Sequence, residues 1–487
     1  MFTHLQEKEK SEPKGTWRVI NIILLTLFAI LTGLVIFIMY SYNFLAFRYI
    51  NIVYTVFLIG IFLISLFLIL TKKRKMLTSA LLILSSVISI VTLLVFKSAI
   101  DMTDKMNKTA SYSEIEMSVV VPVSSAITDV SELSSVQAPI NSDGNNIEKL
   151  LSQIQIDKRV TLSTEEVDSY QTAYENIITG TSQAMVLNSA YSSLLELSYP
   201  DYKSNLKTIY SYTIKKKISD DKNASNSNVF NIYISGIDTY GSISTVSRSD
   251  VNIILTVNMN THKILMTTTP RDSYVEIPDG GANQYDKLTH AGIYGVETSQ
   301  KTLEKLYDIE IDYYARVNFT SFIKLIDAVG GVTVYNDQAF TSYTNKDYSF
   351  EVGNVTLSSE AALAFVRERY SLENGDYDRG LNQLKVVRAI INKLSSLKSI
   401  GNFSTIFSNL ESSVQTNMSL KSMMSIVNEQ LSSSSKFKIT SQEITGTGSI
   451  GELPSYAMPT ASLYMIQLED SNIASASQAI KDIMEGK

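Results

Sequence analysis

The sequence of 487 residues contains no cysteine and only three histidines. Without cysteine, disulfide bonds and cysteine-ligated zinc sites are excluded. The histidines, His4, His262 and His290, stand too far apart in the chain to indicate a histidine-built metal site. Charged residues are also scarce, at 18%, whereas hydrophobic residues make up 45%, a balance that favours membrane insertion. The net charge of -6 argues against a protein that mainly coats nucleic acid.

Three long apolar runs lie near the start of the chain, at Val19–Tyr40, Ile50–Thr71 and Met76–Phe96. Each is close to the roughly 20 residues that a helix needs to cross the hydrocarbon core of a bilayer. A cleavable signal peptide has a shorter apolar core and is not followed by two further spans. The sequence therefore predicts three transmembrane helices within residues 17–97, after a cytoplasmic N-terminus of residues 1–16.

The basic residues around these runs predict the orientation in the membrane. Lysines and an arginine between Lys8 and Arg18 precede the first run, and residues 72–75 (KKRK) separate the second run from the third. The loop between the first two runs carries only Arg48. Because basic loops stay in the cytoplasm, an odd number of spans places everything after Lys97 outside. We expect a multi-pass protein of the cell membrane with a large extracellular C-terminal region.

The exported part divides at a polar, turn-rich stretch, Ser219–Asn228. Before it, residues 98–225 carry helical patterns near Ile147–Ile156 and Glu165–Leu197 together with short apolar runs. This composition predicts a small α/β accessory domain, in which no chemical constellation is visible. After the stretch, residues 226–487 form the second exported domain.

The second exported domain mixes strand and helix patterns. Runs rich in β-branched and aromatic residues predict strands at Val229–Ile237, Val251–Met259 and Lys263–Thr269. A short polar connection between the second and third strands predicts a hairpin. Helical patterns follow at Glu297–Leu306, Phe319–Val329, Ser359–Arg369 and Arg379–Leu397. This order predicts an α/β fold, a three-layer sandwich around a central mixed sheet.

Charged side chains are predicted to meet at one end of this sheet. Asp238 follows the first strand, Asp250 precedes the second, and Arg271 follows the third. If the first two strands are antiparallel neighbours and the third returns from the hairpin, all three side chains lie at the same end. Two neighbouring carboxylates resist ionisation unless a cation lies between them, and oxygen ligands of this kind suit Mg²⁺. The alternative is that the aspartates are ordinary residues of surface loops.

A second charged group comprises Arg367, Arg369, Asp376, Arg379 and Gln383. Arg379 and Gln383 are four residues apart and share a helical face. Arg367 and Arg369 can point into one site only if their helix ends there, as Asn374-Gly375 indicates. Guanidinium groups match phosphate oxygens, so this group predicts a pyrophosphate site beside the metal. The alternative is a solvated salt-bridge network with the acidic neighbours Glu368, Glu373 and Asp378.

Six sequence blocks resemble the LytR-CpsA-Psr family in their order and spacing. They are Ile234–Asp238 (ISGID), Arg248–Asp250 (RSD), Thr268–Asp272 (TTPRD), Lys287–Ala291 (KLTHA), Val317–Val332 (VNFTSFIKLIDAVGGV) and Arg367–Gln383. Together they extend over roughly residues 228–390. The three-span layout is similar to streptococcal CpsA-like members from capsule loci. Residues 98–225 resemble the accessory domain that some capsule-linked members carry.

The resemblance implies a Gram-positive extracytoplasmic phosphotransferase that moves a glycan from a polyprenyl pyrophosphate carrier to a peptidoglycan hydroxyl. The glycan we expect first is capsular polysaccharide, and teichoic acid is second. By position, Asp238 and Asp250 would hold Mg²⁺, and Asp376 would orient Arg379. The pyrophosphate would be bound by Arg248, Arg271, Lys287, Arg367, Arg369, Arg379 and Gln383. Arg271, Arg367, Arg369 and Asp238 would be catalytic, with Asp238 a candidate proton acceptor.

The family pattern also implies an apolar tunnel for the lipid, with Leu325, Ile326, Val329 and Leu363 as candidate walls or as ordinary core residues. Two positions depart from the pattern. Asn382 stands where many relatives carry a basic residue, which could weaken the hold on phosphate. Gly295-Val296 stands where many have two glycines, which concerns the start of a helix.

Two other functions are compatible with the same residues. The chain could be a non-catalytic regulator of capsule biosynthesis that binds polyprenyl phosphate or glycan. It could also be a membrane-bound transcriptional regulator, although the predicted topology leaves too little protein in the cytoplasm for a groove-reading fold. The partners we expect are the polyprenyl pyrophosphate-linked glycan, peptidoglycan and capsule assembly proteins, and we expect no nucleic acid.

Overall fold

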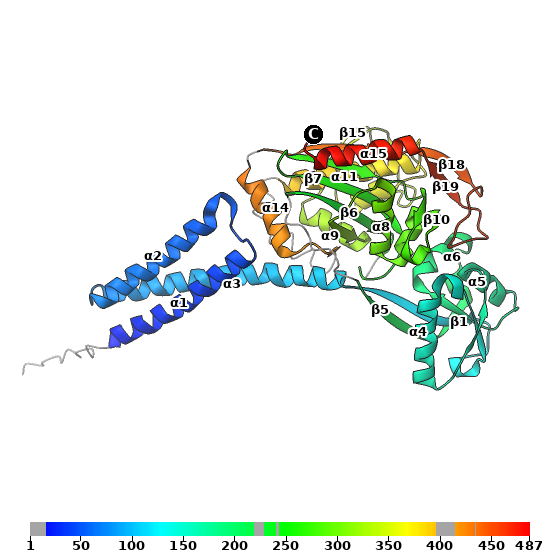
Figure 1. Cartoon of the computed structure of the whole chain (residues 1–487), viewed down its shortest axis with the longest axis horizontal. Coiled ribbons are helices and arrows are strands. Elements are labelled where there is room, and N and C mark those ends of the chain that lie inside the picture. Colours follow the sequence, from blue (N-terminus) through cyan, green and yellow to red (C-terminus); the bar gives the residue numbers. More distant parts are fainter. Residues whose placement is uncertain (1–15, 219–227, 240–242, 396–413, 434) are drawn as a thin grey trace, which may run out of the picture. The chain divides into compact units, whose positions relative to one another are not determined.

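The computed structural model describes residues 16–218, 228–239, 243–395, 414–433 and 435–487 (Figure 1). The chain divides into two compact units. The first contains residues 1–103 and 419–434, and the second contains residues 104–418 and 435–487. The predicted linker Ser219–Asn228 lies, apart from its last residue, outside the described residues.

Three helices long and apolar enough to cross a membrane make up most of the first unit. They are α1 (Thr16–Ser41), α2 (Ile50–Leu70) and α3 (Lys75–Ala110). The three predicted spans are therefore confirmed as apolar helices. Helix α3 continues past Phe96, where the apolar run ends, because no proline or glycine interrupts the polar residues that follow. Phe28, Leu58 and Leu82 are buried between the helices.

A fourth helix, α14 (Leu420–Ser432), belongs to the same unit. Its Asn428 holds the loop between α1 and α2: Nδ2 donates to the carbonyl of Asn43 (2.6 Å), and Oδ1 accepts from the amide of Phe47 (3.2 Å). Ser419 caps the helix by accepting from the amide of Ser422. We expected residues 226–487 to form one domain, whereas this helix packs with the apolar helices.

The accessory region contains a five-stranded sheet of order β3-β2-β4-β1-β5. Its elements are β1 (Tyr112–Pro122), β2 (Ser135–Ala138), α4 (Ile140–Lys158), β3 (Ser163–Glu166), α5 (Tyr170–Ile178), β4 (Met185–Asn188), α6 (Ser192–Ser198) and β5 (Leu206–Lys217). Helix α4 confirms the helical pattern near Ile147–Ile156. The helical pattern expected over Glu165–Leu197 is wrong, because buried strand β4 divides it. A short apolar run cannot be assigned to a strand or a helix by periodicity alone.

The second exported region is built on a six-stranded mixed sheet of order β16-β11-β6-β7-β8-β17. Its antiparallel centre, β6 (Val229–Ile237), β7 (Ser249–Asn258) and β8 (Lys263–Thr268), confirms the three predicted strands and their hairpin. Strand β11 (Tyr313–Val317) runs parallel to β6, and β17 (Lys438–Glu443) runs parallel to β8. The remaining edge strand is β16 (Val414–Thr416).

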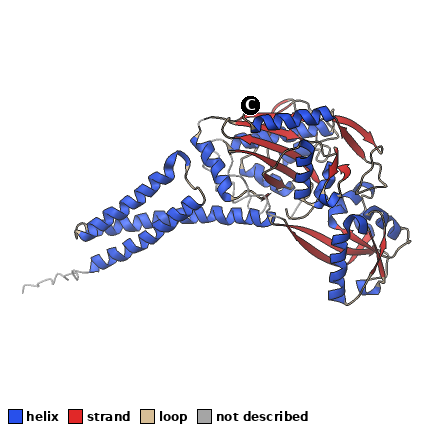
Figure 2. Cartoon of the chain, viewed as in Figure 1, coloured by secondary structure: helices blue, strands red, loops and turns tan. Residues whose placement is uncertain are grey.

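Helices cover both faces of this sheet (Figure 2). Successive residues of β17 point to opposite faces. Gln442 donates to the carbonyl of Ala476 (3.3 Å) on α15 (Asp470–Met484), whereas a Cβ added to Gly380 on α11 (Asp376–Leu394) would lie 2.9 Å from Oε1 of Glu443. The predicted three-layer α/β sandwich is therefore confirmed.

The other helices also match their predictions. On the α15 side, α8 (Val296–Tyr307) shares a core with α15, and on the α11 side α9 (Phe319–Ala328) and α10 (Ser359–Arg367) share a core with α11. Ile326 lies in this second core with Leu325 and Val329 against it, as ordinary packing predicts. Shorter elements are β9 (Tyr274–Ile277), β10 (Gln284–Lys287), α7 (Leu288–Ala291), β12 (Val332–Asn336), β13 (Phe340–Thr341), β14 (Ser349–Phe350), β15 (Gly353–Leu357), β18 (Gly446–Ile450) and β19 (Tyr464–Leu468).

Candidate functional site

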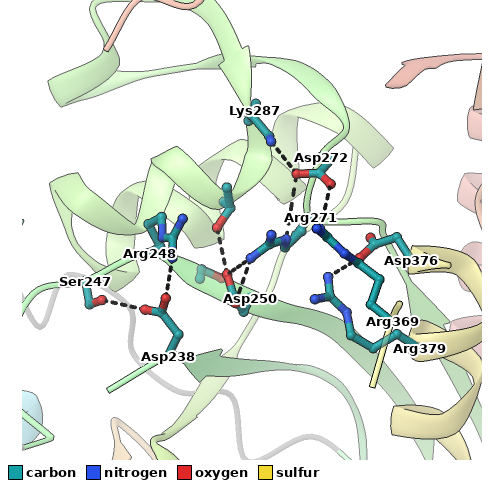
Figure 3. A network of polar contacts seen from close by, with 12 residues as sticks. Asp238, Ser247, Arg248, Asp250, Arg271, Asp272, Lys287, Arg369, Asp376 and Arg379 are labelled. Carbon is teal, nitrogen blue, oxygen red and sulfur yellow. Dashed lines mark hydrogen bonds and ion pairs between the residues drawn. The ribbon is translucent and has the colours of Figure 1, made fainter. Parts of the chain in front are cut away.

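The strand register brings the predicted charges to one end of the six-stranded sheet. Gly236 of β6 pairs with Val251 of β7, and Ile253 of β7 pairs with Thr268 of β8. The residues just beyond these pairs are those that the sequence analysis selected, and Figure 3 shows them as one network of polar contacts. Antiparallel pairing therefore places the exit of β6, the entry of β7 and the exit of β8 side by side.

The centre of the network is a buried pair between Arg271 and Asp250. The Arg271 Nη1 donates to both carboxylate oxygens of Asp250 (2.9 and 2.8 Å), and Thr289 Oγ1 donates to one of them (3.1 Å). Burial opposes ionisation of Asp250, but the guanidinium groups of Arg271, Arg248 and Arg379 outweigh it and hold its pKa below the ordinary range. Asp250 is therefore a carboxylate at neutral pH.

Asp272, which follows Arg271, links further cations to this pair. Its carboxylate lies 2.5 Å from Nζ of Lys287, 3.7 Å from Nε of Arg271 and 4.0 Å from Nη1 of Arg369. Burial raises the pKa of Asp272, but the nearby Arg271 and Lys287 lower it by more, so the group stays ionised. Asp272 lies in the family block TTPRD, for which no role of this aspartate was predicted, and the structure makes it the common partner of three cations.

Asp238 and Arg248 form a neighbouring pair. Nη2 of Arg248 lies 2.5 Å from the Asp238 carboxylate, and Ser247 Oγ donates to the same carboxylate (3.0 Å). Nε of Arg248 is buried and has no hydrogen-bond partner in the part of the chain that the structure describes. An unsatisfied guanidinium donor at this position suits an anionic ligand.

Helix α11 adds the last pair of the network. Asp376 and Arg379 lie one turn apart at its start and form an ion pair, as the predicted orienting role of Asp376 requires. Burial raises the pKa of Asp376 and lowers that of Arg379, so each group needs the other to remain charged. Gly375, with φ of 55°, allows the chain to turn into the helix at this point.

Two predicted phosphate-binding residues make their contacts outside this network. The guanidinium of Arg367 lies 4.2 Å from the centre of the Phe319 ring, and Gln383 donates to the carbonyl of Val366 (3.3 Å). Helix α10 ends at Arg367, so Arg369 lies beyond the helix. Helical geometry therefore does not force the two arginine side chains to point in different directions. The prediction that the helix ends here is confirmed.

Two acidic neighbours proposed for the alternative salt-bridge network, Glu368 and Asp378, form no ion pair with an arginine within the described residues. Glu368 accepts hydrogen bonds from the backbone amides of Arg369 and Ser371 (2.9 Å each), and Asp378 accepts from Gln338 and Asn374. These carboxylates therefore cap turns instead of neutralising the arginines.

The two departures from the family pattern have local explanations. Asn382 is buried and accepts from Nζ of Lys385 (3.1 Å), so it is part of the packing of α11. Gly295 precedes α8 with φ of 113°, a conformation that side-chain-bearing residues rarely adopt. The second departure therefore concerns the start of α8, as expected.

Sequence reasoning missed two charged residues near the site. Arg316 of β11 is fully buried and donates to the carbonyls of Ile243 (3.0 Å) and Thr245 (2.9 Å), in the segment that leads to Arg248. Burial lowers the pKa of Arg316 to about 10. An arginine inside an apolar strand could have signalled this role. The second is Glu443, at the end of β17, for which no motif gave a signal.

The residues present fit a magnesium ion with few protein ligands. The described residues contain no group of three or more histidine, aspartate or glutamate side chains arranged to hold a metal. Asp238 and Asp250 nevertheless both belong to the network of polar contacts in Figure 3, each paired with an arginine. Mg²⁺ commonly binds through one or two carboxylates and completes its shell with water and substrate phosphates. Such an ion would therefore need a phosphate ligand at the same site.

Comparison with known families gives one match over most of the exported region. The model of the LytR_cpsA_psr family matches residues 198–472, which is more than half of the chain. The model of the DNA polymerase processivity factor family matches residues 72–187, a range that begins between α2 and α3 and covers less than half of the chain.

Individual relatives match the same region. The polyisoprenyl-teichoic acid--peptidoglycan teichoic acid transferase TagU of Oceanobacillus iheyensis is 33% identical over 54% of this chain and 77% of its own length. The protein of the same name from Enterococcus faecalis is 32% identical over 53% of this chain and 83% of its own length. Among solved structures, TagV of B. subtilis is 25% identical over 53% of this chain and 97% of that chain, with a TM-score of 0.46.

Proposed function

Because the chain belongs to the LytR_cpsA_psr family, we propose that it transfers a glycan phosphate from a polyprenyl pyrophosphate carrier to a peptidoglycan hydroxyl. The observation that carries the proposal is the network at the sheet end, which gathers Arg248, Arg271, Lys287, Arg369 and Arg379 around four aspartates (Figure 3). A diphosphate is the anion that such a cluster suits, because guanidinium forks match its oxygens. The names of the relatives, which specify transfer of teichoic acid to peptidoglycan, support the same reaction class.

The reaction is a displacement at phosphorus. The acceptor hydroxyl oxygen forms a bond to the glycan-bearing phosphorus, and the bridging P–O bond breaks, so the polyprenyl phosphate leaves with the electron pair. Phosphoryl transfer needs positioning and charge stabilisation more than covalent help from the protein. Arg271, Arg369 and Arg379 would stabilise the charge that develops on the leaving phosphate. Lys287 would act on the site through Asp272, as a positioning residue.

A magnesium ion would be held by Asp238 and Asp250. When bound, it would neutralise phosphate charge and help to orient the diphosphate. Asp238 and Asp250 are each paired with an arginine. When the ion and its phosphate ligand bind, the carboxylates would turn to the ion and the arginines would turn to the phosphate. Asp250 is already ionised, as a magnesium ligand must be.

Two classes of glycan are candidates for the transferred group. Capsular polysaccharide is our first expectation, from the resemblance to capsule-locus members, and the relatives' names specify teichoic acid. The protein would reach both the polyprenyl carrier and the peptidoglycan acceptor at the outer face of the cell membrane, where the apolar helices would anchor it. Capsule assembly proteins are the further partners that we expect.

The test is the release of polyprenyl phosphate by the full chain in detergent with Mg²⁺. Synthetic polyprenyl pyrophosphate donors carrying a capsular or a teichoic-acid unit are mixed with peptidoglycan oligomers, and both products are measured by mass spectrometry. We expect transfer with the wild type and loss of about 100-fold or more with Arg271→Ala, because a charge-stabilising group is removed.

A regulator without catalysis would bind the donor and release no polyprenyl phosphate, and that result would overturn the proposal. Removing Mg²⁺ with a chelator should lower the rate with wild type, and adding Mg²⁺ back should restore it. A rate that is indifferent to the chelator would contradict the metal site at Asp238 and Asp250.

A further inference from the structure

Glu443 lies at the same end of the sheet as the charge network. It is the last residue of β17, and its register partner on the neighbouring strand β8 is Thr268. Two residues after Thr268, the chain leaves the strand through Pro270 and Arg271. The parallel pairing of β8 and β17 therefore brings the exit of β17 to the exit of β8.

The side chain of Glu443 points toward α11 and not toward α15. Its neighbour Gln442 contacts α15 on one face of the sheet, so Glu443 points to the other face. There its Oε1 would lie only 2.9 Å from a Cβ added to Gly380, the residue after Arg379. The absence of a side chain at Gly380 thus leaves room for a carboxyl group under the first turns of α11.

Glu443 differs from the other carboxylates at this end of the sheet in having no cation. Asp238, Asp250, Asp272 and Asp376 each form an ion pair with an arginine or a lysine. For Glu443, the structure gives neither an ion pair nor a hydrogen bond within the described residues. Its side chain is partly exposed.

Asp376 and Asp378 of α11 are the charged groups that act on Glu443, and Tyr377 of α11 and Thr268 of β8 are its uncharged neighbours. Burial, followed by the charges of Asp376 and Asp378, raises the pKa of Glu443 to about 8. Asp250 and Asp272, by contrast, are held ionised by cations, which makes them weak proton acceptors.

We propose that Glu443 is a catalytic residue of this transfer, the group that accepts the proton of the acceptor hydroxyl. The inference rests on the proposed function. As the hydroxyl oxygen bonds to phosphorus, its proton passes to the Glu443 carboxylate, and the electron pair of the broken P–O bond leaves on the polyprenyl phosphate. Effective general bases have a pKa near the working pH, a condition that this carboxyl meets and that Asp250 and Asp272, which cations hold ionised, do not.

The matched substitution is Glu443→Gln in the full chain, assayed by release of polyprenyl phosphate from the synthetic donor. A general base contributes about 100-fold or more, so kcat should fall by at least that factor while KM for the donor changes little. Because the carboxylate is the active form, the wild-type rate should rise with pH through about 8 and then level off. This rise should be absent from the residual activity of Glu443→Gln.

Glu443→Asp keeps a carboxyl group of lower intrinsic pKa. Its rate should be reduced, and the midpoint of its pH profile should lie below that of the wild type. Glu452→Gln, at an exposed glutamate, is the control and should keep the wild-type rate and profile.

The outcomes separate this inference from the proposed function. If the wild type releases no polyprenyl phosphate, the proposed transfer is wrong. If the wild type is active and Glu443→Gln keeps its rate and its rise through about pH 8, Glu443 is not the proton acceptor. An unshifted midpoint in Glu443→Asp would overturn the inference equally, even if Glu443→Gln failed to fold.

Discussion

At the scale of single residues, the site consists of arginines that are already held by carboxylates. Arg271 contacts both oxygens of Asp250, and Arg379 pairs with Asp376. Buried pairs of this kind add little net stability, but removal of one partner leaves an uncompensated charge, at a cost of about 3–5 kcal/mol. Their value here is positional, because guanidinium groups fixed in advance lose less freedom when a diphosphate binds.

Arg369 allows the chemical role to be separated from stability. Its side chain is 27% exposed, and its nearest carboxylate, Asp272, is 4.0 Å away. Partly exposed pairs contribute about 0–1 kcal/mol, so Arg369→Ala should leave the free energy of unfolding nearly unchanged. Transfer should fall by about 100-fold, because a cation at the phosphate site is lost. Denaturant unfolding and the polyprenyl phosphate assay measure the two effects.

The matched control is Arg388→Ala, on α11 but with its guanidinium donating to Ser441 of β17 (3.1 Å). It should have wild-type activity. If Arg369→Ala transferred the glycan at the wild-type rate, the assignment of Arg369 to the phosphate site would be wrong.

At the scale of secondary-structure elements, α7 and the turn after it determine where the entry of β7 lies. Gly292, directly after α7, packs on the backbone of residues 247–249. A Cβ at Gly292 would lie 2.6 Å from the carbonyl oxygen of Ser247 and 2.6 Å from the amide nitrogen of Ser249. The segment that carries Arg248 and leads to Asp250 is thus held from one side by this turn and from another by Arg316.

Gly292→Ala should therefore disturb the site without touching a charged group. Backbone atoms cannot yield as a flexible side chain does, so overpacking should cost about 1–3 kcal/mol of stability. The transfer rate per folded molecule should also fall, because the substitution should displace Arg248 and Asp250. Thermal unfolding and the transfer rate per folded molecule are the measurements.

Gly144→Ala, in α4, is the matched control. Its added Cβ would meet Cγ2 of Ile140 at 3.6 Å, an ordinary contact, and alanine favours a helix. A Gly292→Ala enzyme with the wild-type rate would show that the contact does not position the site.

At the scale of the whole molecule, α14 links the exported sequence to the membrane helices. Asn428 binds the loop between α1 and α2, so this loop and α14 must lie on the same side of the membrane. The distribution of basic residues placed the same loop outside. The contact therefore agrees with the predicted topology, in which this loop and α14 lie on the same side of the membrane.

The absence of cysteine makes this topology directly measurable. A single cysteine at the exposed Ser471 should react with a membrane-impermeant maleimide on intact cells, whereas one at the exposed Lys73 should react only after permeabilisation. The cysteine-free wild type is the background control. If Lys73→Cys were labelled on intact cells and Ser471→Cys were not, the orientation in the membrane would be the opposite of the predicted one.

The sequence by itself determined the features that depend on local pattern. Length and apolarity specified the three membrane helices, and strand patterns with their flanking charges specified that Asp238, Asp250 and Arg271 would meet, because antiparallel neighbours return to the same sheet end. The turn residues Asn374-Gly375 likewise indicated that α10 ends before them, whereas α11 begins at Asp376, three residues before the predicted start. The role of Asp376 beside Arg379, by contrast, was expected only from the family resemblance.

Only the tertiary structure decided which charges face one another. The role of Asp272 depends on Lys287 and Arg369, which are distant in the chain, and Glu443 reaches the site only because β17 pairs with β8 across more than 170 residues. Strand β4 is a second example. Periodicity alone does not tell whether its short apolar run is a strand or a helix, and only its pairing with β2 and β1 decides that it is a strand. Local pattern sets what a segment can form, whereas burial and the charges around a side chain are properties of the packed molecule.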